Sequence, residues 1–123
     1  MLNFFMEFTI TRIYSDSAGD SHFEDQFIPL GDAGAIGYLS KGTASKEVYF
    51  RYVHADYDYD YHTAPQKQLV VLLDGVIEIE TSRGEKRVFS GGSVLLLEDT
   101  CGKGHKTKNV ADAKRKSLFI TLP

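Results

Sequence analysis

The sequence contains 123 residues, with a formal net charge of −3 and a hydrophobic fraction of 42 %. This length suits a single domain spanning residues 1–123, and the composition excludes wholesale disorder. The acidic balance gives no general attraction for nucleic acid or for an anionic membrane surface. No apolar run approaches the ~20 residues that a membrane-spanning helix requires. We therefore expect a soluble protein without nucleic-acid or membrane partners.

Cys101 is the only cysteine, so no internal disulfide can form, which favours a reducing compartment. The N-terminal segment MLNFFMEF is apolar, but it lacks a basic region and is interrupted by Glu7, so it does not resemble a signal peptide. Met6 offers an alternative start for the natural protein, in which case residues 1–5 are an extension. We expect a cytoplasmic protein.

Strand signals outnumber helix signals along the chain. Val, Ile, Tyr and Phe recur in short runs, and clusters of Gly, Asp and Ser separate these runs. A turn every eight to twelve residues or so is typical of a β-sandwich or barrel. Strands are expected, in chain order, over residues 8–13, 21–30, 47–53, 68–73, 76–81, 86–89, 93–97, 105–110 and 117–122.

The strand that starts at Gln68 gives the first hint of a site. It is followed by Asp74-Gly75, the strongest two-residue hairpin signal in the chain. Side chains alternate along a strand, so Gln68 shares its face with two apolar residues. A glutamine at the start of an apolar face is explained if that face lines a polar cavity. The residues on the opposite face are Leu69, Val71 and Leu73.

Residues 56–61 alternate aspartate with tyrosine. If this segment is extended, three carboxylates lie on one face and three phenols on the other, and His62 continues the acidic face. Three aspartates and a histidine could attract a cation. We expect instead that the aspartates face solvent and that the tyrosines cover the barrel wall or a dimer surface, because a phenol combines an apolar body with a polar tip.

The segment that begins at His62 resembles the first motif of the cupin superfamily, where metal-binding members present two histidines and a glutamate. His62 stands at the first histidine of that motif, and Gln68 stands at its glutamate. Gly75 matches the glycine that closes the motif. Ala64 falls where the second histidine would be, so the resemblance is partial.

The segment from Gly92 to Asn109 resembles the second cupin motif. Glu98 stands at its proline, and His105 occupies the place of its histidine, with Asn109 four residues later. The resemblance implies an all-β fold of the cupin type, a jelly roll that is also described as a double-stranded β-helix barrel. It implies no particular substrate.

The chain is more closely similar to a group of small bacterial cupins of unassigned function. The stretches that it shares with this group are Gly-Asp-Ser-His-Phe at 19–23, His-Thr-Ala-Pro at 62–65 together with Gln68, Glu-Asp-Thr at 98–100 and Gly-Lys-Gly-His at 102–105. These stretches surround the two cupin histidines, so they are the part of the sequence in which a site is expected.

The resemblance leaves two kinds of chemistry open. Metal-binding cupins hold a divalent ion with three histidines and one glutamate, but Ala64 and Gln68 occupy two of those places, and a neutral carboxamide offsets none of the charge of a dication. His62, Gln68 and His105 could still bind one divalent metal ion with open positions for water. In the metal-free alternative, which some cupin isomerases and epimerases use, barrel histidines act as acid and base.

The expected function is the binding of a small polar metabolite inside the barrel. One hypothesis is an enzyme of the isomerase or lyase type that uses His62 and His105 as catalytic residues. The alternative is a non-catalytic, ligand-binding or sensing cupin without metal, so the sequence leaves open whether the protein is an enzyme. The residues expected to bind the ligand are Gln68, Glu98, Asp99 and Asn109.

Two expectations concern the surface. The outward apolar residues of the strand at 68–73, together with the habit of cupins to pair, predict a homodimer, and a structural dimer with a vestigial pocket is a third reading. Residues 101–123 contain six lysines or arginines and one aspartate. Such a run is usually a solvated surface, which is the expected role here, although a basic rim could also attract an anionic ligand.

Overall fold

The structure is a computed structural model that describes residues 6–123; residues 1–5, including the expected extension before Met6, lie outside the described part. The described chain is almost entirely strand, as expected. Its elements are β1 (Met6–Ser15), β2 (Ser21–Asp32), η1 (Gly34–Ile36), β3 (Tyr38–Leu39), β4 (Val48–Val53), β5 (Asp58–His62), β6 (Gln68–Leu72), β7 (Val76–Thr81), β8 (Lys86–Ser90), β9 (Val94–Glu98), β10 (His105–Asn109) and β11 (Arg115–Thr121). Over the residues described, no helix has the length and apolar character needed to cross a membrane.

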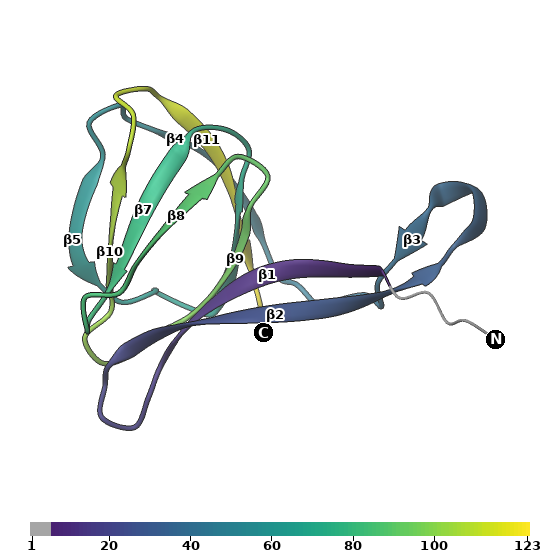
Figure 1. The fold of residues 1–123 in the computed structure, drawn as a ribbon, viewed down its shortest axis with the longest axis horizontal. Coiled ribbons are helices and arrows are strands. Elements are labelled where there is room, and N and C mark those ends of the chain that lie inside the picture. Colours follow the sequence, from purple (N-terminus) through teal and green to yellow (C-terminus); the bar gives the residue numbers. More distant parts are fainter. Residues whose placement is uncertain (1–5) are drawn as a thin grey trace.

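The strands form two sheets that face each other. A seven-stranded sheet has the order β3-β2-β1-β9-β6-β11-β4, and a four-stranded sheet has the order β5-β10-β7-β8. Neighbouring strands are antiparallel except for β1 and β9, which run parallel. In Figure 1 the two sheets enclose a barrel, and β1, β2 and β3 extend beyond it as an arm. The all-β architecture predicted from the sequence is therefore confirmed.

The side chains that point between the sheets form the main core. In β6, Gln68 is buried together with the two apolar residues of its face, so the predicted alternation of this strand is confirmed. In β7, Ile77 and Ile79 are buried, while Glu78 and Glu80 are not. The buried members of this core are Ile13, Phe23, Ala64, Val70, Leu72, Ile77, Ile79, Phe89, Leu95 and Leu97. Burial of this apolar surface provides the main driving force for closing the two sheets on each other.

The prediction of a hairpin at Asp74-Gly75 is wrong, because the strands on either side of this turn, β6 and β7, do not pair with each other. The chain does turn there, and Gly75 has a φ of +72°, which favours glycine. However, β6 pairs with β9 and β11, whereas β7 pairs with β8 and β10. The turn therefore carries the chain from one sheet to the other. A Cβ at position 75 would lie 2.8 Å from the Cβ of Arg115, so the crossing is also a close approach.

The outer face of β6 contributes to a second, smaller cluster. Leu69 packs there against the buried Ile10, Leu96 and Leu122. Leu73 remains 51 % exposed, and Val71 is half-buried. This face is thus partly covered by the chain itself, and the homodimer expected from it stays a prediction.

Candidate functional site

A cavity of about 240 Å³ lies between the two sheets. The three residues predicted to form the centre of the site, His62, Gln68 and His105, all line it. The side chains that complete its wall are Arg51, Tyr57, Tyr59, Ala64, Pro65, Val70, Leu72, Ile77, Ile79, Leu95, Leu97, Thr107, Arg115 and Phe119. Most of the lining is apolar, and the polar groups come from β4, β5, β6, β10 and β11. Such a wall suits a small ligand that is oriented by a few polar contacts.

A β-bulge turns His62 into the cavity. In the pairing of β5 with β10, His62 is opposite His105, but Tyr59 is opposite Thr107, so β5 has one more residue than β10 between these two pairs. A bulge of this kind changes which face the following side chain occupies. The expectation that His62 continues the acidic face of residues 56–60 is therefore wrong, because strict alternation is interrupted before it. Tyr59 does face the cavity wall, as expected.

Asp99 contacts the ring nitrogen Nδ1 of His105 and orients the imidazole. The Nδ1 atom of His105 lies 2.5 Å from Oδ2 of Asp99, and the two residues are 2 % and 0 % exposed. An ionised carboxylate can only accept a hydrogen bond, so Nδ1 carries the proton and donates it to Asp99. Nε2 of His105 is then the ring nitrogen that remains for a ligand. Asp99 itself does not line the cavity.

The second imidazole lies directly beside the first. The ring centroids of His62 and His105 are 4.6 Å apart, and the ring of Tyr59 lies 4.0 Å from that of His62. His62 donates from Nδ1 to the backbone carbonyl of Asp60 at 2.8 Å, which again leaves Nε2 free. Burial, together with the charge of His105, lowers the pKa of His62 below its ordinary value of 6.5. His62 is therefore neutral at physiological pH.

Two glycines allow the loop before His105 to approach the rest of the site. A Cβ at Gly104 would overlap the backbone carbonyl of His62, and a Cβ at Gly102 would lie 2.5 Å from the backbone oxygen of Gly19. Neither position has room for a side chain. The hydroxyl of Ser21 also donates to the Gly104 carbonyl at 2.7 Å. The two glycines of the Gly-Lys-Gly-His stretch are thus explained by close backbone contacts.

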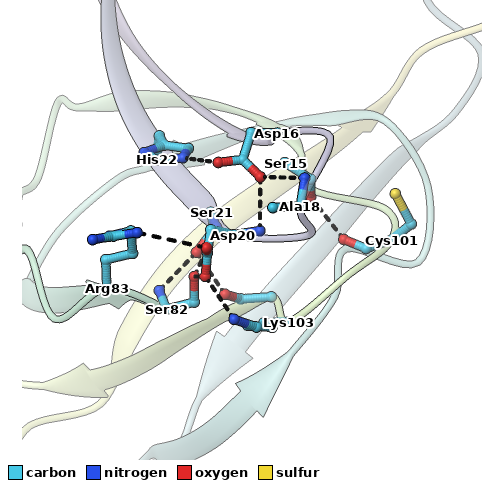
Figure 2. Close-up of polar contacts among 11 residues, drawn as sticks. Ser15, Asp16, Ala18, Asp20, Ser21, His22, Ser82, Arg83, Cys101 and Lys103 are labelled. Carbon is cyan, nitrogen blue, oxygen red and sulfur yellow. Dashed lines mark hydrogen bonds and ion pairs between the residues drawn. The ribbon is translucent and has the colours of Figure 1, made fainter.

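The shared Gly-Asp-Ser-His stretch is a structural clamp, as Figure 2 shows. Asp20 accepts hydrogen bonds from Lys103 and Ser82, each at 2.9 Å. His22 pairs with Asp16 at 2.6 Å, outside the cavity. The Asp20–Lys103 bond and the 2.9 Å bond from the Lys103 backbone N–H to the Gly19 carbonyl join the turn between β1 and β2 to the loop that precedes His105. The His22–Asp16 pair lies within the β1–β2 hairpin. Residues of the β1–β2 turn, which are distant from His105 in the sequence, therefore help to position the loop that leads to this cavity histidine.

Two other predicted ligand-binding residues lie away from the cavity. The carboxylate of Glu98 accepts from Arg12 at 2.6 Å and pairs with Lys67 at 3.1 Å. Burial alone would raise the pKa of Glu98, but these two bonds outweigh it and hold the pKa below its usual value. Neither Glu98 nor Asn109 lines the cavity. Their observed contacts are structural, and a direct role in ligand binding finds no support in their positions.

The cavity does not fit the divalent metal ion that the cupin resemblance implied. The candidate ligands His62, Gln68 and His105 carry no negative charge, and Arg51 and Arg115 line the same cavity. A dication there would meet two positive charges without a carboxylate in the cavity wall to offset them. In the part of the chain that the structure describes, no group of three His, Cys, Asp or Glu side chains is arranged to hold a metal.

Sequence reasoning missed the two cavity arginines. Arg51 shares a face of its strand with the buried Val53, which was a detectable signal that it points inward. Arg115 was counted only as one charge of the basic segment 101–123. The lysines of that segment that are within reach of an acid, Lys103, Lys106 and Lys108, pair with acidic groups at the surface. The expectation that the basic residues of this segment lie on a solvated surface therefore holds for these lysines, but not for Arg115, which is buried.

Comparison with solved structures identifies the fold. A putative ethanolamine utilization protein, EutQ from Salmonella typhimurium, aligns over 98 % of both chains with a TM-score of 0.50 at 13 % identity. The cupin domain of Schizosaccharomyces pombe Cnp3 aligns over 97 % of this chain and 84 % of its own, with a TM-score of 0.50 at 10 % identity. The fold is that of a cupin. The cupin-type jelly roll implied by the two motifs is thus confirmed.

The cupin fold does not by itself identify the ligand. Identities of 10–13 % with these structures establish the shared fold alone. No protein-family description matches the chain, and no curated protein matches it in sequence. The function of this cupin-fold protein therefore depends on the residues of its cavity.

Proposed function

We propose that this cupin is a metal-independent acid–base enzyme that isomerises a small polar metabolite inside the barrel. The observation that carries the proposal is the buried His105–Asp99 pair, whose imidazole lies beside that of His62 in the cavity wall. A histidine that is oriented by a carboxylate and placed beside a second histidine is suited to proton transfer. The wall around them is largely apolar, which strengthens electrostatic interactions with a bound substrate.

The two histidines have different roles in this proposal. His62 is neutral and presents the lone pair of Nε2, so it removes a proton from a carbon next to a carbonyl group. His105, which Asp99 orients through Nδ1, acts as the acid in this proposal and delivers a proton from Nε2 to the carbonyl oxygen. The electron pair of the broken C–H bond forms the double bond of an enediol. His62 then returns the proton to the former carbonyl carbon, and the hydroxyl group on the carbon that was first deprotonated gives its proton to His105 as it becomes the new carbonyl. The isomerisation is complete without any net redox change.

The remaining polar groups would orient the substrate. Gln68 is 4 % exposed and lines the cavity, so its amide can both donate to and accept from hydroxyl or carbonyl groups. Thr107 adds a hydroxyl from β10, two residues from His105. A non-catalytic cupin that only binds the same metabolite would use the same contacts. The distinguishing property is proton exchange.

Exchange of substrate protons with solvent tests this proposal. The EDTA-treated protein is incubated in D₂O with a panel of small hydroxy-ketones, hydroxy-aldehydes and keto acids, and loss of C–H signals is followed by ¹H NMR. We expect enzyme-dependent exchange in one member of the panel, slowed about 100-fold or more in His62→Gln and His105→Gln. His54→Gln, at an exposed position outside the cavity, is the matched control. Binding without exchange would favour the non-catalytic alternative, and unchanged exchange in His105→Gln would refute the mechanism.

A further inference from the structure

We propose that Arg51 and Arg115 form a receptor for an oxyanionic group of the ligand, a carboxylate or a phosphate. The receptor lies in the same cavity as the two histidines but is built from β4 and β11. The inference that the substrate itself is anionic rests on the proposed function. The inference that Arg51 and Arg115 bind an anion does not depend on catalysis. The class of substrate would then be a small metabolite with an anionic group at one end.

The main evidence is an unsatisfied donor on Arg115. This residue is only 2 % exposed, and its Nε donates to Oδ1 of Asn109 at 2.7 Å. Its Nη1 is buried and has no hydrogen-bond partner. A charged donor that is buried without a partner costs free energy, so such groups call for a specific explanation. Since Arg115 lines the cavity, an anionic ligand would supply the missing acceptor.

Arg51 provides a second guanidinium close to the first. In the pairing of β11 with β4, Arg115 is opposite Val53 and Arg51 is opposite Ser117, so the two arginines are neighbours across this strand pair. The ring of Tyr57 lies within 5.1 Å of the Arg51 Cζ and within 5.3 Å of the Arg115 Cζ. Stacking on an aromatic ring restricts the planar guanidinium group. Tyr57 thus holds both groups at the wall.

The charge of this pair is not balanced by the protein. Over residues 6–123, neither arginine has a carboxylate within ion-pair distance, and the cavity wall contains no Asp or Glu. Burial, and then the charge of Arg51, lower the pKa of the Arg115 guanidinium, while Tyr57 and the more distant Asp74 oppose this only in part. A guanidinium group keeps its proton under such conditions, so an anion is the means of relieving the repulsion.

The position of the pair relative to the histidines limits the ligand. Arg115 is bonded to Asn109 at the end of β10, whereas His105 begins this strand. Four residues of a strand span roughly 13 Å between Cα atoms. Side chains that reach inward shorten this distance, and the cavity holds only about 240 Å³. The ligand is therefore a short molecule, with its anionic end at the arginines and its exchanging carbon near the imidazoles.

Thermal unfolding with simple anions tests the receptor directly. Inorganic phosphate and sodium acetate are the probes, and sodium chloride at matched ionic strength is the reference. For the wild-type protein we expect at least one probe to raise the midpoint by about 2–5 °C in a saturable manner. In Arg51→Gln and Arg115→Met the concentration that gives half of this rise should increase at least tenfold. Arg83→Gln, whose side chain is 69 % exposed, is the matched control and should respond as the wild type does.

The outcomes separate this inference from the proposed function. A response to phosphate alone identifies a phosphate ester, and a response to acetate alone identifies a carboxylate; either supports the receptor. No response beyond that to chloride, or an equal response in Arg51→Gln, overturns it even if Arg115→Met fails to fold. If the receptor binds anions but the cavity exchanges no substrate protons, the receptor stands and the enzyme proposal fails. His105→Gln should keep the full anion response.

Discussion

Gly104 lies so close to His62 that a Cβ at position 104 would overlap both the oxygen and the carbon of the His62 carbonyl group. This contact joins the backbone of the loop before His105 to the backbone at the end of β5. Because His62 and His105 also pair across β5 and β10, the two cavity histidines are fixed to each other through the main chain. The relative position of the two imidazoles is consequently set by the main chain of the barrel.

Replacing Gly104 by alanine should therefore disturb the site as well as the fold. Gly84→Ala is a matched control, because Gly84 has a φ of +85°, similar to the +73° of Gly104, but a Cβ there would meet nothing within 4 Å. The left-handed conformation alone costs roughly 1–2 kcal/mol in either variant. We expect Gly104→Ala to lose about 2 kcal/mol more than Gly84→Ala in urea denaturation. Equal losses would contradict the close contact.

The role of Asp99 is tested by Asp99→Asn. An amide at this position no longer stabilises a positive imidazole, so we expect the exchange rate to fall about 100- to 10,000-fold, with circular dichroism unchanged. Asp16→Asn removes the carboxylate of the other His–Asp pair, outside the cavity, and should leave the rate unchanged. Equal effects of the two substitutions would argue against a special role for Asp99.

The lowered pKa of His62 predicts a pH dependence of stability. Between its ordinary value of 6.5 and its lower value in the folded state, the unfolded chain binds more protons at this residue. The free energy of unfolding therefore falls as the pH drops below about 6.5 and is fully recovered above it. In His62→Gln this contribution should be missing, so the loss of stability between pH 7.5 and 5.5 should be smaller. An identical pH slope in both proteins, measured by urea denaturation, would contradict the assignment.

The homodimer was expected from the outward face of β6, but the chain itself covers part of that face, so the exposed apolar residues of the arm are tested as the interface instead. Phe27 in β2 and Val88 in β8 are each 60 % exposed, but only Phe27 belongs to the strands that project from the barrel in Figure 1. Exposed apolar surface of this kind marks interfaces. We expect light scattering at micromolar concentration to give a dimer for the wild type and for Val88→Glu, and a monomer for Phe27→Glu. A wild-type monomer would refute the homodimer.

Much of the fold could be predicted because it depends on local signals. Alternating polarity placed most strands within a few residues of their observed bounds, and it identified the inward face of β6 that begins with Gln68. The partner of each strand could not be predicted in this way. Asp74-Gly75 has the chemistry of a hairpin turn, yet the same turn geometry serves here to cross between sheets. Pairing is decided by packing of distant segments, which a local pattern does not contain.

The sequence predicted only those site residues that the two cupin motifs identify. The resemblance brought His62, Gln68 and His105 together, and the structure places all three in one cavity. It did not reveal that Asp99 supports His105, because that contact is a matter of side-chain direction after a strand has ended. The β-bulge in β5 was also invisible, since a bulge breaks the very alternation on which the prediction relied.

The most direct test of the proposed acid–base site is long-range ¹H–¹⁵N NMR of the two cavity imidazoles. Both His62 and His105 must carry a proton on Nδ1, because these atoms donate to the Asp60 carbonyl and to Asp99. We predict cross-peak patterns of a protonated Nδ1 for both rings, with His62 remaining neutral below pH 6.5. A proton on Nε2 alone in either ring at neutral pH would contradict the proposed site.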